Sequence, residues 1–217
     1  MTVRAALRSA LVETYRCSWR LLLVNTALTA AIGMVVLIVS TLPLALLIAP
    51  LVAGPVAAAL VHCTIKVIRE EEFQLRDAVE GLRLHWRRGF ALGGLFGLGL
   101  LLGSLAVSFY ISERHRALPL AVLAAYVFAI FSLLVLLAWP LAIAEPEARI
   151  FDAFRGAWSL LMRTPFRFLA LGAALLVVNA LGIVTVLPFL TLTIAYSFLA
   201  AGHVVLPRRS IQEEVTT

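Results

Sequence analysis

The sequence predicts an all-α membrane protein: a polytopic bundle of six transmembrane helices with amphipathic helices at one membrane surface. Of its 217 residues, 62% are hydrophobic and only 14% are charged. A soluble domain needs more charge to cover its surface, and the apolar runs are long enough to cross a bilayer. The net charge of +6 does not indicate nucleic-acid binding, because the basic residues lie beside the apolar runs, where membrane topology places them.

The N-terminal segment is predicted to be a retained anchor. Its apolar run is far longer than the roughly 7–15 residues of a cleaved signal. Before that run, residues 3–19 are predicted to form an amphipathic interfacial helix. Its apolar side chains share one side, at Leu7, Leu11, Tyr15 and Trp19.

The first long run predicts two spans. Residues 21–65 contain no Asp, Glu, Lys or Arg. As one helix they would be about 67 Å long, roughly twice the thickness of the hydrocarbon core. We therefore predict spans near 21–43 and 47–67, separated at a cluster of helix breakers, Pro43, Pro50 and Gly54-Pro55.

A second amphipathic helix is predicted over residues 73–88. Apolar side chains recur at helical spacing at Leu75, Val79, Leu82, Trp86 and Phe90, and charged side chains take the opposite face. A segment of this kind between two apolar runs is expected to lie in the membrane interface, with its arginines toward lipid phosphates.

The remaining chain predicts four more spans and a third amphipathic helix. Uncharged runs give spans at 89–112 and 117–144. Residues 148–162 form the amphipathic helix, with one apolar stripe at Phe151, Phe154, Trp158 and Leu161. The last run is again too long for one span, and Pro188 divides it into 168–187 and 189–206.

Charge placement predicts the topology. With six spans, sixteen of the eighteen Lys and Arg residues fall on the same side as both termini. Only Arg114 and Arg116 fall on the other side. The positive-inside rule then places both termini in the cytoplasm, and we expect a multi-pass protein of the bacterial cell membrane.

Two segments resemble each other closely enough to predict an internal repeat. Residues 75–82 match residues 150–157 at a constant separation of 75 residues, sharing Asp-Ala-x-x-Gly at Asp77 and Asp152. Both copies enter from the same side, so the repeat would be parallel. Chance likeness between apolar sequences is the alternative.

Several residues resemble the YesL (DUF624) family of bacterial membrane proteins. They are Asn25, Pro43, Gly54-Pro55, Ala57-Ala58-Ala59, Lys66 and Glu70-Glu71, followed by the amphipathic segment with Trp86 and Phe90. The resemblance implies an accessory role linked to carbohydrate uptake by ABC transporters. It brings no catalytic or ligand-binding motif, and this chain departs from the family in a longer, more apolar segment between Pro43 and Gly54.

Small residues recur along the predicted 89–112 span, at Gly89, Gly93, Gly97, Ser104 and Ser108. Such spacing lets helix backbones approach closely in lipid. The stripe predicts helix packing, either within one bundle or between two copies, and the sequence leaves the oligomeric state open.

The candidate functional residues are polar groups at two depths. Asn25 and Asn179 lie inside spans, where an amide can hydrogen-bond another helix. A basic cytoplasmic platform, suited to anionic lipid headgroups or a partner's acidic loop, is expected from Arg76, Arg83, Arg87, Arg155 and Arg163. No catalytic motif and no cofactor or metal site is predicted.

These features favour a non-catalytic membrane accessory or scaffold protein whose partners are anionic lipid and, by the resemblance, an ABC transporter. The alternative is a small permease for a neutral solute such as a sugar. An ion-coupled transporter is disfavoured, because the spans carry no Asp, Glu, Lys or Arg at mid-depth.

Overall fold

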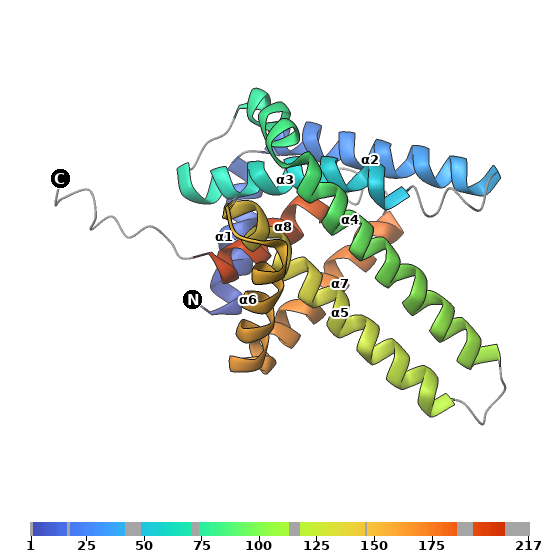
Figure 1. Ribbon diagram of the computed structural model, residues 1–217. Coiled ribbons are helices and arrows are strands. Elements are labelled where there is room, and N and C mark those ends of the chain that lie inside the picture. The colour runs from blue at the N-terminus through green and yellow to red at the C-terminus, as the bar shows by residue number, and fades with distance from the viewer. Residues whose placement is uncertain are drawn as a thin grey trace.

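The computed structural model describes residues 2–16, 18–41, 49–70, 74–112, 118–145, 147–185 and 193–206. Within these ranges the chain is all-helical, which confirms the predicted class (Figure 1). The helices are α1 (Val3–Arg16), α2 (Ser18–Thr41), α3 (Ala49–Glu70), α4 (Leu75–Ser112), α5 (Leu118–Ala144), α6 (Ile150–Arg163), α7 (Pro165–Thr185) and α8 (Ile194–Val205).

Four stretches of the described helices are long and apolar enough to cross a membrane. They are Val52–Glu70, Leu75–Ile111, Pro119–Ala144 and Pro165–Gly182, in α3, α4, α5 and α7. The helix α8 is apolar, but its 12 residues extend about 18 Å, less than the hydrocarbon core. The helix α2 covers most of the first predicted span, and the side chains of residues 34–41 lie outside the described part. A helical membrane bundle is thus confirmed in its coarse form.

The helix break predicted between residues 88 and 89 is absent, because α4 runs as one helix of 38 residues. Nothing at Arg88-Gly89 interrupts the backbone hydrogen bonds, and a single glycine costs only about 1 kcal/mol in a helix. At the corresponding place after α6, Pro165 lacks an N–H and forces Thr164 out of the helical region, at φ −142° and ψ 65°. There the chain does break, between α6 and α7.

The prolines expected to separate the first two spans do not all end helices. Pro43 lies outside the described residues, as does Pro188. Pro50 is the second residue of α3, where a missing N–H is tolerated, and Pro55 lies inside the same helix. The start of α3 at Ala49 is nevertheless close to the predicted residue 47.

The centre of the bundle is α3. In its most apolar stretch 56% of the residues are buried, against 11% in α4. Its buried side chains include Leu60, Val61 and Val67, and they belong to one core with Leu137 of α5 and Leu199 of α8. The other long helices therefore turn much of their apolar surface outward, as helices in lipid do.

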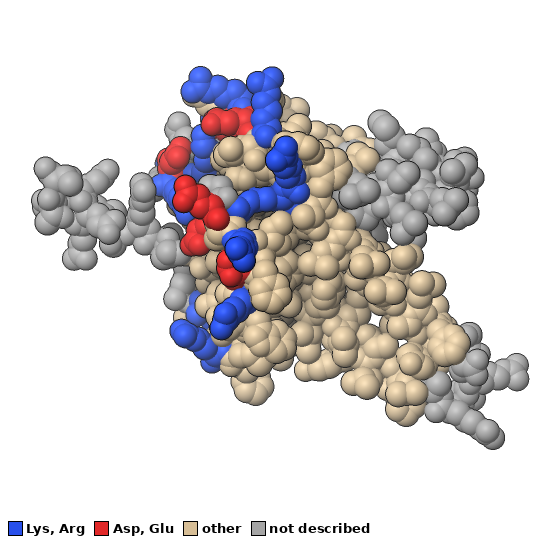
Figure 2. All heavy atoms as spheres, viewed as in Figure 1, with Lys and Arg blue, Asp and Glu red and all other residues tan. Residues whose placement is uncertain are grey.

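Charged side chains gather at one end of the molecule. In the face that Figure 2 shows, Lys, Arg, Asp and Glu lie together at this end, and the rest of the described surface is free of charge. Large apolar side chains lie exposed farther along α4 and α5, such as Phe109 and Val122. An apolar surface that extends along two long helices would be exceptional in water and is ordinary in lipid.

Candidate lipid and partner interface

Each of the three amphipathic segments packs on the bundle through a row of residues four positions apart, most of them small or polar. In α1 the buried residues are Ala6, Ala10 and Thr14. In α6 they are Ala153, Ala157 and Leu161. In the first half of α4, residues 75–88, they are Asp77, Gly81 and His85.

Many large apolar side chains of the same segments, together with Trp19 at the start of α2, are exposed. We call this set the interfacial collar: Leu11, Tyr15, Trp19, Val79, Leu82, Trp86, Phe151, Trp158 and Met162. Tyr15 is 86% exposed and Phe151 76%. The predicted stripe at residues 75–90 is exposed throughout, whereas in α6 Leu161 is buried and Phe154 is half-buried. Aromatic and aliphatic groups presented in this way suit the boundary between headgroups and acyl chains.

The five predicted platform arginines lie in α4 and α6, and all five are exposed. Within the described part of the chain none of them makes a hydrogen bond or an ion pair. The guanidinium of Arg87 lies over the Trp86 ring, 5.2 Å from its centroid. These arginines are therefore free to donate to groups outside the chain, among them lipid phosphates.

Two neighbouring cations are committed instead. Lys66 of α3 donates to Oδ1 of Asp77 at 3.0 Å. The guanidinium of Arg88 donates to three backbone carbonyls, those of Ala142, Glu145 and Ala148. Free and committed cations thus occur side by side on α4, and Arg87 and Arg88 differ completely in role.

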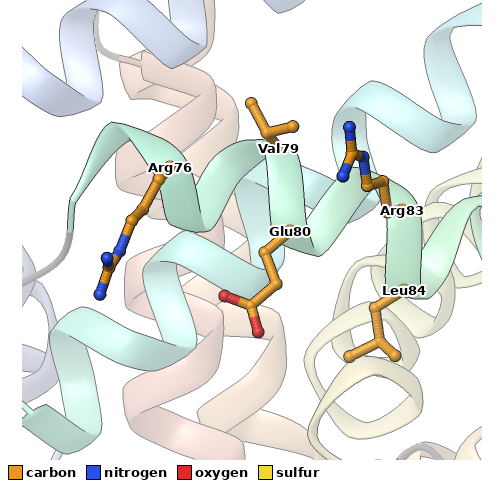
Figure 3. Close-up of a pocket in the computed structure, with 5 residues that line it drawn as sticks. All are labelled: Arg76, Val79, Glu80, Arg83 and Leu84. Atoms are coloured by element: carbon orange, nitrogen blue, oxygen red, sulfur yellow. The ribbon is translucent and has the colours of Figure 1, made fainter.

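A surface hollow lies on the first half of α4, lined by Arg76, Val79, Glu80, Arg83 and Leu84. Figure 3 shows Arg76 and Glu80 projecting to one side of the helix and Val79 and Arg83 to the other. A small-molecule site needs polar groups that converge on one position. These side chains diverge, so the surface is better suited to a lipid boundary or a protein face.

The first half of α4 and the helix α6 begin in the same way. Oδ2 of Asp77 accepts the Gln74 N–H at 2.7 Å, and Oδ2 of Asp152 accepts the Arg149 N–H at 3.2 Å. Each aspartate is the third residue of its helix, and its carboxylate accepts the N–H of the residue that immediately precedes the helix. Four positions later, Gly81 lies against His62 of α3, as Gly156 lies against Leu141 of α5.

Both predicted intramembrane amides contact α8. Asn25 is fully buried, and its Oδ1 accepts the Ala195 N–H at 3.1 Å. Nδ2 of Asn179 donates to Oγ of Ser197 at 2.9 Å. No side chain of its own caps α8 at Thr193, so Asn25 of α2 supplies a cap from another helix.

Replacing Asn25 with leucine is expected to lower the free energy of unfolding by about 1–3 kcal/mol, because the buried Ala195 N–H loses an acceptor. Unfolding of the purified protein by a denaturing detergent measures this change. The control is Ser104→Ala, because Ser104 is exposed and its hydroxyl bonds the Leu100 carbonyl of its own helix. Equal stability of the two variants would contradict the capping role.

The predicted small-residue stripe is divided between environments. Gly89 and Gly93 are buried, and both lie against Gly54 of α3. Gly97 is half-buried, whereas Ser104 and Ser108 are exposed on the surface of the chain. Two further glycines of α4 contact α5, since Gly99 meets Phe131 and Gly103 meets Phe128.

The described residues contain no group of three or more His, Cys, Asp or Glu placed to hold a metal ion. Within the described residues the chain is an all-helical protein with helices long and apolar enough to cross a membrane, and in the face of Figure 2 its charges gather at one end. No protein-family model matches the chain, and no curated protein and no solved structure shows significant similarity to it. The likeness to the YesL family remains an expectation from the sequence.

Proposed function

We propose that this chain is a non-catalytic accessory or scaffold protein of the bacterial cell membrane, which presents a basic platform to anionic lipid or to a partner. The observation that carries the proposal is that the free arginines and the side chains of the interfacial collar lie together at one end of the molecule. A free arginine beside an exposed aromatic ring, as at Arg87 and Trp86, suits a charged headgroup region.

The proposal includes six spans with both termini cytoplasmic. The spans are α2, α3, the part of α4 from Gly89, α5, α7 and the segment that contains α8. At 1.5 Å per residue α4 is about 57 Å long, so it exceeds the hydrocarbon core by more than 20 Å. The charged first half is the part that extends out of the hydrocarbon, because burying its arginines would be costly.

We also propose a parallel repeat, in which each unit is an amphipathic segment followed by a hairpin of two spans. Its support is the matched start of α4 and α6, where Asp77 and Asp152 make equivalent bonds and each following glycine faces the preceding helix. The units differ at their ends, since Pro165 breaks the second copy and nothing breaks the first.

Charge reversal at Arg83, Arg87 and Arg163 tests the platform. Each arginine near an anionic surface contributes about 1 kcal/mol, so the loss of one arginine should lower the local preference for anionic lipid about fivefold, and each reversal, which changes the charge by two, should lower it further. Quenching of the native tryptophans by brominated phosphatidylglycerol, compared with brominated phosphatidylcholine, measures that preference. Arg→Gln at the same positions should give an intermediate loss, and an unchanged preference would contradict the platform.

A protein partner gives a different outcome of the same variants. Carbohydrate ABC transporters are the partners that the YesL resemblance implies. Co-purification from native membranes should then recover a stoichiometric transporter with the unaltered chain and lose it with the triple reversal. If the triple reversal keeps the preference for anionic lipid but loses the transporter, the platform binds a protein partner.

The second candidate is a small permease for a neutral solute. It is favoured by the polar contacts of Asn25, Asn179 and Ser197 where α8 begins inside the bundle. Proteoliposomes loaded with sugars test it. Saturable flux that Asn25→Leu abolishes would support the permease and count against a purely accessory role.

A further inference from the structure

A pair of histidines lies between α3 and the first half of α4. The rings of His62 and His85 have centroids 5.2 Å apart and are tilted by 44°. His85 is 2% exposed. Neither Nε2 of His62 nor Nδ1 of His85 has a hydrogen-bond partner among the residues that the structure describes, and both atoms are buried.

Two unpartnered buried nitrogens in contacting rings are unusual, because a buried polar group without a partner has lost its hydration and gained no hydrogen bond in exchange. A neutral imidazole has one nitrogen that accepts a proton, and histidine does so in the physiological range. With only two histidines the pair falls short of the three or four protein ligands of a zinc site. The ligand that fits both rings is a proton.

Charged groups near the pair act in both directions. Lys66 and Arg88 are positive, whereas Glu70, Asp77 and Glu80 are negative. Burial is the largest cause that lowers the pKa of His85, to about 4, and the charges of His62 and Arg88 add to it. Asp77 is already engaged with Lys66 and the Gln74 N–H, and Glu70 and Glu80 are exposed, so solvent screens them. Two protonated rings at this separation would repel each other with little compensation.

We propose that His62 and His85 form a buried proton-binding site that holds the first half of α4 against α3 when both rings are neutral and releases it when they are protonated. Release lets both imidazolium groups reach water. This proton-binding site goes beyond the proposed function, and it does not depend on what the platform binds.

The packing limits the movement to residues 75–87. Gly81 lies directly on His62, where an added Cβ would be 2.9 Å from the His62 Cβ, so the rings cannot separate without moving this segment. Farther along, Gly89 lies against Pro55, and Arg88 is bonded to the end of α5. These contacts place the pivot at residues 88–89. The moving segment carries three of the platform arginines, Arg76, Arg83 and Arg87.

Spin labels on the full-length protein in lipid nanodiscs test the proposal. Labels at Arg69→Cys on α3 and Leu84→Cys on α4, with both native cysteines replaced, report the separation. Lowering the pH from 8 to 5.5 should lengthen and broaden this distance and leave the distance from Arg69→Cys to Arg155→Cys on α6 unchanged. Carboxylates stay largely ionised over this range.

The double variant His62→Gln, His85→Gln should lose the pH response, while His203→Gln, which removes another buried histidine, should retain it. A response that survives in the double variant, or none in the unaltered chain, would overturn the proposal. If the double variant does not fold, hydrogen exchange of the unaltered chain decides. Protection of residues 75–87 should fall relative to α6 by up to about tenfold per pH unit for each proton taken up, and equal protection would refute the site.

Discussion

Replacing Gly89 with leucine is expected to force α4 away from α3 and to lower the free energy of unfolding by about 3 kcal/mol or more. An added Cβ at Gly89 would lie 2.6 Å from the Cα of Pro55 and 2.8 Å from the backbone oxygen of Gly54. Both neighbours are backbone atoms inside a helix, so no side-chain rotation can relieve the clash. Close backbone approach of this kind is what small residues permit between helices in lipid.

A matched control is available at Gly33 of α2. An added Cβ there would meet nothing within 4 Å among the described residues. We expect Gly33→Leu to change the stability by less than about 1 kcal/mol, because it adds no clash and costs no helix propensity. Detergent-induced unfolding, followed by circular dichroism, measures both variants.

The partner glycine provides the internal check. Gly54→Leu should destabilise the protein to a similar extent, and the double variant should cost less than the two single changes together, because both remove one contact. If Gly89→Leu is as stable as Gly33→Leu, the close approach of α3 and α4 is not what holds them together.

Helix ends were predictable where the sequence marks them chemically. The prediction of 117–144 is one residue from α5, Leu118–Ala144, and 148–162 is close to α6, Ile150–Arg163. At these ends charged residues or prolines interrupt an apolar or amphipathic pattern. At Arg88-Gly89 only the hydrophobic pattern changes. A change of environment along a helix does not require a change of backbone conformation. The sequence therefore predicts two helices where the structure has one, α4.

The candidate site was predictable in its residues but not in its partners. Exposed arginines follow from helical spacing, and Asn25 and Asn179 were expected to bond other helices. That both would contact α8 depends on how distant helices pack, since Asn25 and Ala195 are 170 residues apart. The same holds for His62 and His85, because no local pattern in the sequence links these two residues.

Arginine 88 yields the second large effect, because it joins three segments. Its Nη1 donates to the Glu145 oxygen at 2.9 Å, and its Nη2 donates to the Ala148 oxygen at 2.7 Å. Nη1 also donates to the carbonyl of Ala142 in the last turn of α5. Carbonyls at the end of a helix have no partner within it, and the negative end of its dipole favours a cation. One side chain thus holds α4 to α5 and to the turn before α6.

Arg88→Met should therefore lower the free energy of unfolding by about 3 kcal/mol, since it keeps the apolar stem and removes charge-assisted hydrogen bonds to three carbonyls. Arg88→Lys should recover little of the loss, because an ammonium group lacks the planar fork that reaches several acceptors at once. The control is Arg87→Met, which removes only a stacking contact with Trp86 and should cost less than about 1 kcal/mol. Detergent-induced unfolding again measures stability, and hydrogen exchange in α6 reports the turn. If Arg87→Met and Arg88→Met unfold at the same detergent concentration and protect α6 equally, the carbonyl contacts of Arg88 do not stabilise this end of the bundle.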